Sequence, residues 1–350
     1  LSIMTKLNVE EIDKKYNVRH FIEAPKSKAA INPIQLDAID FSLLKEGDEH
    51  KPARQKLANK LEDSLSKLGF VAITNHGIEH ETYEHIISLA QSVCELPREV
   101  QKDYLAGAWK SDQENREKTS TDKSGGERGT GFKPKGYWSM KNGVEDSIVH
   151  YNFNSIIQSD FLDTTKHKYP EIIEAHLKEI QDYFSQIHNN VLRRLTYLCD
   201  IILELPEGYL WENYFKPVDG DRQNSGGGVA RFMRYTKMST EDDEKVGKQW
   251  LRGHSDGGGI TFITSQPILS LQIRDYYTGE WRYVGHIPNA FIVNVGDALE
   301  FITGGYFKSS IHRVVTPPED QVDYTRLVLI YFADPKDNAE LDPELLNSPK

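Results

Sequence analysis

The feature that most restricts the fold of this chain is a series of short β-rich runs between residues 229 and 332. Turn residues such as Gly279 and Gly296 separate these runs, and regularly spaced short strands are typical of a β-sandwich or barrel. We expect strands at 229–235, 259–264, 270–274, 281–284, 290–295, 310–315 and 326–332.

The segment before residue 229 follows helical spacing instead. Residues 52–68 and 80–94 predict helices, and residues 70–74 predict a strand between them. Residues 170–204 predict one long amphipathic helix with Pro170 in its first turn. Because helices come first and strands later, we predict an α+β fold with helices packed on one side of a double-sheet roll.

Two histidines and an aspartate form a candidate metal site. His254 and Asp256 are two residues apart in HSDGGGITF, and on a strand such positions point to one face, while His312 lies on a later strand. Two imidazoles and one carboxylate hold Fe(II) in facial-triad sites and leave coordination positions open. About one His-x-Asp tripeptide arises by chance in such a composition. From spacing alone, a surface histidine beside a solvated aspartate, with a separate buried histidine, is an equally good interpretation.

Arg326 follows His312 on the last predicted strand, after a turn at Pro317-Pro318 that would bring it beside the metal strand. A guanidinium is always charged and binds carboxylates through two parallel hydrogen bonds, which suits a dicarboxylate co-substrate. Taken alone, a structural salt bridge at the mouth of the barrel is the simpler interpretation.

Charge and cysteine content exclude several classes of protein. The net charge of −11 argues against a sequence-independent nucleic-acid binder, because phosphate binding needs a basic surface. Cys94 and Cys199 lack disulfide or zinc spacing and lie in apolar helical patterns, which favours buried free thiols. No apolar run reaches the ~20 residues that span a bilayer, and no charged-then-apolar signal pattern is present. We therefore expect a cytoplasmic protein without membrane or nucleic-acid partners.

Motifs spread over most of the chain match one family. They are GFVAITNHGI at 69–78, ELPREVQK at 95–102, GFKPKG at 131–136, SLQI at 270–273 with Trp281, NVGDALE at 294–300 and TGGYFKSSIHRV at 303–314. In this order they resemble the isopenicillin N synthase-like family of Fe(II)/2-oxoglutarate-dependent oxygenases.

The resemblance implies a double-stranded β-helix (jelly-roll) core with flanking helices, one long helix being packed against the roll. It implies that His254, Asp256 and His312 hold Fe(II), and that Arg326 and Tyr235 bind the distal carboxylate of 2-oxoglutarate. It also implies a dioxygenase that uses O2 to hydroxylate or desaturate a small organic molecule, with succinate and CO2 as co-products. No catalytic residue beyond the metal ligands is required, since the metal supplies the chemistry.

The chain departs from the family pattern around the expected carboxylate site. Val328 stands where the family usually has the serine of Arg-x-Ser, Met233 where many members have asparagine, and Thr236 where proline is usual. A buried arginine without partners is costly, so we expect another acceptor to replace the serine hydroxyl. These departures keep open a same-fold Fe(II) oxidase that does not use 2-oxoglutarate, and an ethylene-forming enzyme that cleaves it. A non-catalytic jelly-roll binding protein is a further alternative.

The substrate pocket is predicted from position only. Relatives line it with residues just beyond the carboxylate-binding arginine, which here are Phe332 and Asp334, and the segment around Phe132 and Tyr137 predicts a lid. Core packing explains each aromatic residue equally well. An aromatic-lined pocket would favour an apolar or cyclic small molecule.

We expect one catalytic domain over residues 1–350. It would comprise a helical and strand portion at 4–105, a lid-like loop and strand segment at 106–165, and the long helix with the jelly-roll core at 166–350. Polar residues 105–130 predict a loop within the second part. In solution we expect a monomer or a weak homo-oligomer.

Overall fold

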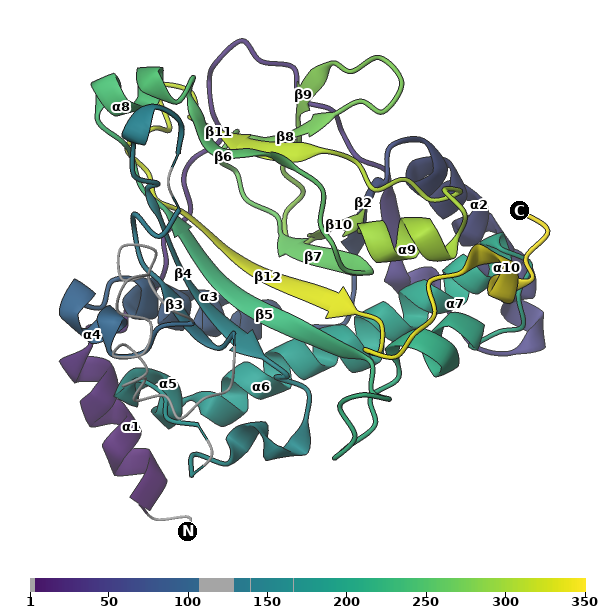
Figure 1. Cartoon of the computed structure of the whole chain (residues 1–350), viewed down its shortest axis with the longest axis horizontal. Helices are drawn as coiled ribbons and strands as arrows, with labels where there is room; N and C mark the ends of the chain where they lie inside the picture. The colour runs from purple at the N-terminus through teal and green to yellow at the C-terminus, as the bar shows by residue number, and fades with distance from the viewer. Residues whose placement is uncertain (1–3, 107–128, 139, 166) are drawn as a thin grey trace.

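The computed structural model describes residues 4–106, 129–138, 140–165 and 167–350, so most of the predicted loop at 105–130 lies outside the described residues. The strands of the described part form two sheets (Figure 1). The large sheet has eight strands, in the order β1 (Ala38–Asp40), β2 (Phe70–Thr74), β10 (Phe291–Val295), β7 (Ile260–Thr264), β12 (Arg326–Asp334), β5 (Gly227–Tyr235), β4 (Ile148–Asn154) and β3 (Gly131–Lys133). The small sheet has four, in the order β6 (Gln249–His254), β11 (His312–Val315), β8 (Leu271–Arg274) and β9 (Trp281–Tyr283).

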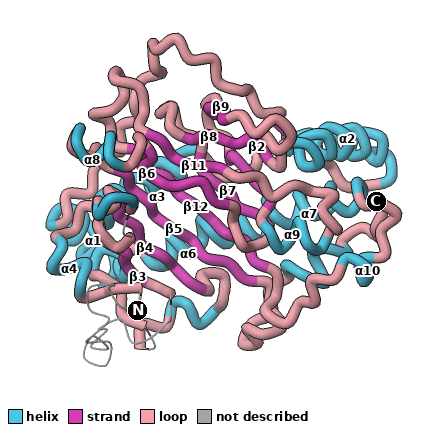
Figure 2. The backbone as a smooth tube through the Cα atoms, turned by 45° about the horizontal axis from the view of Figure 1, so that its top comes forward, coloured by secondary structure: helices cyan, strands magenta, loops and turns pink. Residues whose placement is uncertain are grey.

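Figure 2 shows the strands of the two sheets as a backbone tube. A cavity between the sheets is lined by residues of β5, β7 and β12 on one side and of β6, β8 and β11 on the other. Every strand pair in both sheets is antiparallel except β1 with β2. This arrangement confirms the predicted α+β class with a jelly-roll core.

Strand β12 is buried on both faces, which is why its sequence is an almost continuous apolar run. Leu329 and Tyr331 belong to the core cluster beneath the helices, whereas Val328 and Ile330 belong to a second cluster between the sheets. Successive side chains of a strand point to opposite faces, so this one strand contributes to both cores.

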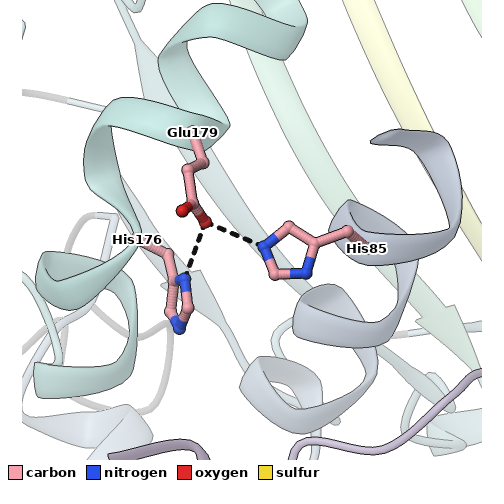
Figure 3. Close-up of side chains that lie close together, drawn as sticks. All are labelled: His85, His176 and Glu179. Carbon is pink, nitrogen blue, oxygen red and sulfur yellow. Dashed lines mark hydrogen bonds and ion pairs between the residues drawn. The ribbon is translucent and has the colours of Figure 1, made fainter. Parts of the chain in front are cut away.

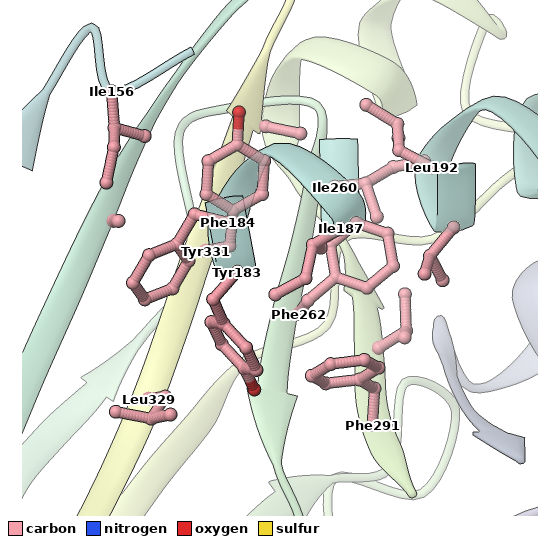
Figure 4. Close-up of a cluster of buried hydrophobic side chains, with 14 of the residues drawn as sticks. Ile156, Tyr183, Phe184, Ile187, Leu192, Ile260, Phe262, Phe291, Leu329 and Tyr331 are labelled. Atoms are coloured by element: carbon pink, nitrogen blue, oxygen red, sulfur yellow. The ribbon is translucent and has the colours of Figure 1, made fainter. Parts of the chain in front are cut away.

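The outer face of the large sheet is covered by α3 (His80–Cys94) and by the segment that runs from residue 171 to residue 202. In Figure 4, Tyr183, Phe184 and Ile187 from that segment lie over Phe262, Leu329 and Tyr331 of the sheet. These aromatic side chains are each at most 1% exposed, and aromatic residues bury large apolar areas. The sheet that carries the cavity is therefore supported from behind by a rigid apolar layer.

The expectation of one continuous helix over 170–204 was wrong. The segment consists of α5 (Glu171–Ala175), α6 (Leu177–Gln186), a π-helical stretch (Ile187–Leu192) and α7 (Arg193–Ile202). The α-helical conformation breaks at His176, where φ is −114° and ψ is 13°. The His176 ring bonds Asp13 of α1 (Met4–Lys15) through Nε2. Through Nδ1 it bonds Glu179, which also bonds His85 of α3 (Figure 3).

The remaining helices lie around the roll. Leu57, Leu61 and Leu65 of α2 (Lys51–Lys67) are buried as their spacing predicts. The helix ends at Lys67, and Gly69, whose φ is +72°, turns the chain just beyond it. The others are α4 (Arg98–Lys102), α8 (Thr240–Lys245), α9 (Asp297–Ile302) and α10 (Pro343–Leu346). Both cysteines are buried and unpaired, as predicted. Within the described ranges, none of these helices has the length and apolar character needed to cross a membrane.

Candidate functional site

The structure brings His254, Asp256 and His312 together inside the roll. His254 ends β6 and His312 begins β11, and the two residues are direct partners in the antiparallel pairing of these strands. Oδ1 of Asp256 lies 3.7 Å from Nε2 of each histidine, and the two ring centroids are 4.4 Å apart. Such a compact set of two imidazoles and one carboxylate oxygen suits a single divalent metal ion.

Asp256 does not share a strand with His254, contrary to our expectation. Strand β6 ends at His254, and Asp256 lies in the loop that carries the chain from the small sheet to β7 of the large sheet. The Asp256 carbonyl accepts a hydrogen bond from the backbone N–H of Asp297 at 2.7 Å, which holds this loop in place. The triad thus lies where the chain crosses between the two sheets.

Backbone carbonyls set the tautomer of both histidines. Nδ1 of His254 lies 2.8 Å from the carbonyl oxygen of Arg252, and Nδ1 of His312 lies 3.2 Å from that of Ser310. Since a carbonyl only accepts, each Nδ1 carries a proton, and Nε2 is the ring nitrogen that faces Asp256. Burial lowers the pKa of His312, against the opposing effect of Asp256, so its ring is neutral at neutral pH. Neutral imidazoles with oriented lone pairs are what metal binding requires.

The two carboxylate oxygens of Asp256 make different contacts. Oδ2 accepts hydrogen bonds from the Thr261 hydroxyl at 2.7 Å and the Asn294 amide at 2.8 Å, which leaves Oδ1 facing the histidines. Burial acts to raise the pKa of Asp256, but His312, these hydrogen bonds and His254 outweigh it and lower the pKa below its ordinary value. The carboxylate is therefore an anion aimed at the centre of the triad.

Asp297, at the start of α9, connects the segments that carry the two histidines. Its carboxylate accepts hydrogen bonds from the hydroxyls of Ser255 at 3.1 Å and Ser309 at 2.6 Å. Gly296 precedes it because a Cβ there would lie 2.1 Å from the carbonyl oxygen of Gly258, so no other residue fits this approach. The NVGDALE and KSS motifs thus have a mechanical role in positioning the triad.

Arg326 lies within the same cavity but not beside β11, because β12 pairs with β5 and β7 in the large sheet. Its guanidinium carbon lies 4.7 Å from the ring centroid of Tyr235, so the cation stacks on this aromatic face. Arg326 is 4% exposed, and its Nε has no hydrogen-bond partner. No carboxylate in the described residues forms an ion pair with it. A buried, incompletely satisfied cation is suited to binding an anion.

The expected replacement for the family's serine is not found among the described residues. Val328 is fully buried in an apolar cluster with Met233 and Trp250, so the position two residues beyond Arg326 on β12 carries no hydroxyl. The Tyr235 hydroxyl donates its own proton to Sδ of Met233 at 3.3 Å. Arg326 therefore has an aromatic ring and a phenol beside it rather than the predicted extra acceptor.

The predicted substrate residues fall into two groups. Phe332 lines the cavity beside the triad. Asp334 lies one step further along β12 against Gly258, and burial raises its pKa to about 6. Phe132 is fully buried in the helix-side core with its ring edge on Tyr151, so the structure does not bring it to the cavity. Tyr137 is likewise not among the described residues that line this cavity.

Sequence reasoning missed Arg231, a second arginine of the cavity wall. It lies four residues before Tyr235 on β5, so both side chains point to the inner face of the sheet. The even spacing of Arg231 and Tyr235 on a predicted strand is the sequence feature that could have identified Arg231. Asn294 and Thr261 were also missed as partners of Asp256, although Asn294 belongs to a motif that the sequence singles out.

Two family models match the chain. The model of the 2OG-Fe(II) oxygenase superfamily matches residues 222–335, which contain the triad, Arg326 and Tyr235. The model described as "non-haem dioxygenase in morphine synthesis N-terminal" matches residues 36–147. The two matched segments do not overlap and follow each other along the chain.

Individual relatives agree with these models. The chain is 26% identical over 331 residues to a 1-aminocyclopropane-1-carboxylate oxidase of Dictyostelium mucoroides, covering 87% of this chain and 83% of that protein. It is 25% identical over 296 residues to jasmonate-induced oxygenase 3 of Arabidopsis thaliana, covering 82% and 69%. A full-length protein of Neurospora crassa, solved in complex with alpha-KG and thymine, superposes with a TM-score of 0.68 at 19% identity, covering 89% and 90%.

Proposed function

This chain belongs to the 2OG-Fe(II) oxygenase superfamily, and we propose that, as an Fe(II)- and 2-oxoglutarate-dependent dioxygenase, it hydroxylates or desaturates a small organic molecule. Succinate and CO2 are the co-products. The observation that carries the proposal is the triad itself, two imidazoles and one carboxylate whose ligand atoms all lie within 4.8 Å of one another.

We assign the metal to His254, Asp256 and His312. Three protein ligands leave positions for a co-substrate and O2, which is the feature that separates such sites from closed structural ones. When bound, Fe(II) activates O2 for oxidation of the substrate, and the protein orients the reactants and excludes water. The hydrogen bonds of Arg252, Ser310, Asn294 and Thr261 hold the ligand atoms in the orientation that the metal needs.

We assign the distal carboxylate of 2-oxoglutarate to Arg326, with Tyr235 as a neighbouring donor. The unpartnered Nε of Arg326 supports this assignment, because a buried donor without an acceptor costs roughly 1–3 kcal/mol. A carboxylate would satisfy it and neutralise the buried charge. The residues present therefore fit the co-substrate, although they do so without the serine that the family usually supplies.

The substrate is a small molecule, in line with the similar protein of Neurospora crassa, whose structure contains thymine. Phe332 and Ile330 of β12 form an apolar part of the cavity wall next to the triad. Phe332 therefore remains a proposed substrate contact and Ile330 joins it, whereas Phe132 does not, because it is buried in the helix-side core.

A same-fold oxidase that does not consume 2-oxoglutarate remains the second candidate, because Val328 removes a hydroxyl from the expected carboxylate site. Titration of the protein with Mn(II) and then 2-oxoglutarate, without oxygen, separates the two. The proposed function requires that Mn(II) binds, that 2-oxoglutarate then binds only to the metal-loaded protein, and that His254→Ala abolishes both steps. Metal binding without any response to 2-oxoglutarate would favour the second candidate.

A further inference from the structure

Two arginines, the buried Arg326 and the half-buried Arg231, face the metal cavity, but 2-oxoglutarate needs only one of them. After 2-oxoglutarate binds the metal through one carboxylate, as the proposed function requires, a single distal carboxylate remains. Arg326, with Tyr235 beside it, accounts for that group. Arg231, on the neighbouring strand β5, is left without an assigned ligand.

Arg231 is held by an amide and an aromatic ring rather than by an acid. Its Nε donates to the amide oxygen of Asn152 at 2.7 Å, and its guanidinium carbon lies 4.7 Å from the ring centroid of Phe332. No ion pair involves Arg231 in the described part of the chain. Burial lowers its pKa to about 10, because the site solvates the cation poorly, while Tyr235 and Asp256 act in the opposite direction. Phe332 and Asn152 hold the guanidinium in a fixed orientation without neutralising its charge.

Two further basic side chains lie on the same inner face. Lys133 of β3 pairs with His150 of β4, and Asn152 of β4 pairs with Arg231 of β5, so alternate positions place all four on one side of the sheet. His150 is 3% exposed, and neither of its ring nitrogens has a hydrogen-bond partner. Nζ of Lys133 lies over the rings of Tyr137 and Trp138, 5.2 and 4.8 Å from their centroids, rather than beside an acid.

The charges of these residues affect one another. Burial and, to a smaller extent, the charge of Arg231 lower the pKa of Lys133 to about 8. Burial also places the pKa of His150 well below its ordinary value, with Arg231 and Lys133 acting in the same direction. A chain of net charge −11 has thus placed Arg231 and Lys133 on one face of the sheet without an acid paired to either in the described residues. Such an arrangement destabilises the fold unless an anion binds there.

We propose that Arg231, Lys133 and His150 form a subsite for an anionic oxygen group of the substrate, a carboxylate or a phosphate. The substrate is then an organic anion, whose charged end binds this row while its carbon skeleton lies along Phe332 towards the triad. This inference rests on the proposed function and narrows its substrate class. The aromatic residues of the pocket suggested an apolar substrate. The subsite implies instead a substrate that is apolar only at the end to be oxidised.

The test compares matched charged and neutral probes on the protein loaded with Mn(II) and 2-oxoglutarate. The probes are benzoate with benzamide, cinnamate with cinnamamide, and phenyl phosphate with phenol. Thermal unfolding midpoints are measured at increasing probe concentration for the wild type, Arg231→Met, Arg231→Lys and the remote control Arg193→Met. Arg193 also lies over an aromatic ring, that of Tyr197, but on α7 outside the cavity.

We expect at least one anion to raise the unfolding midpoint while its neutral counterpart does not. Whichever of the carboxylate and phosphate probes stabilises the protein more then identifies the anionic group that the subsite binds. Arg231→Met should weaken that binding at least about tenfold, as loss of a charge-assisted hydrogen bond does. Arg231→Lys should retain part of the preference, and Arg193→Met all of it.

Equal stabilisation by the charged and neutral probes, or an anion response that survives Arg231→Met, would overturn the subsite. If Arg231→Met loses its response to 2-oxoglutarate, Arg231 binds the co-substrate instead, and this result would also overturn the proposed subsite. Failure of the wild type to bind Mn(II) and 2-oxoglutarate is a separate result, which contradicts the proposed function itself.

Discussion

The guanidinium of Arg326 lies over the ring of Tyr235, with 4.7 Å between the guanidinium carbon and the ring centroid. The contact stabilises a buried cation without consuming its charge, because the ring face is only weakly negative. Arg326 therefore remains available to an anion that enters the cavity.

Arg326→Met should weaken 2-oxoglutarate binding by roughly 10- to 100-fold, the effect of losing one charge-assisted hydrogen-bonding group of about 1.5–3 kcal/mol. Mn(II) affinity should stay unchanged, since Arg326 is not a ligand of the metal. Calorimetric titration of the Mn(II)-loaded protein measures both. If 2-oxoglutarate binds the variant as tightly as the wild type, its carboxylate lies elsewhere.

Val328→Ser should lower the stability of the protein and raise its affinity for 2-oxoglutarate. The change removes apolar volume from a fully buried cluster, which should cost about 1–3 kcal/mol of unfolding free energy. The new hydroxyl lies on the strand two residues from Arg326 and should strengthen 2-oxoglutarate binding by about 3- to 10-fold. Val328→Ala is the matched control, with the stability loss and no gain in affinity. The same affinity in both variants would mean that the hydroxyl does not reach the carboxylate.

Asn294→Ala should weaken metal binding by about 10- to 100-fold without removing a ligand, as is typical of outer-shell partners. The reason is that Asp256 loses the amide donor that fixes Oδ2 and directs Oδ1 to the metal. Mn(II) titration followed by electron paramagnetic resonance measures the affinity. Asn213→Ala, on the exposed surface of another element, should leave it unchanged. Equal effects of the two substitutions would argue against the positioning role.

The His176 network should stabilise the protein more at low pH than at high pH. Burial acts to lower the pKa of His176, but Glu179 and Asp13 outweigh it and raise the pKa above its ordinary value. A histidine with a raised folded-state pKa stabilises fully below the unfolded value of about 6.5, and the contribution disappears as pH rises through the folded value. The loss of unfolding free energy in His176→Gln should therefore be larger at pH 6 than at pH 9. The exposed His20→Gln should show no such difference.

The strands around the metal were predictable because their patterns are local. The apolar runs of β7, β10 and β12 and the motifs at 294–300 and 303–314 lie where the sequence predicts them. The break in the long helix was not predictable. It lies at His176, whose ring bonds Asp13, 163 residues away in the sequence. Periodicity contains no information about such a partner.

The candidate site shows the same limit. The triad follows from spacing and family resemblance, yet the placement of Asp256 in a loop depends on its contact with Asp297. Arg231 was overlooked because its neighbours are residues of three different strands, brought together only by register. Its lack of an acidic partner among the described residues is a property of the folded molecule and cannot be read along the chain.

The carboxylate of Asp297 joins the loop after His254 to the segment before His312 through two serine hydroxyls. Both histidine-bearing segments are thus tied to a single side chain, so a change at Asp297 would displace the two imidazoles together rather than one at a time.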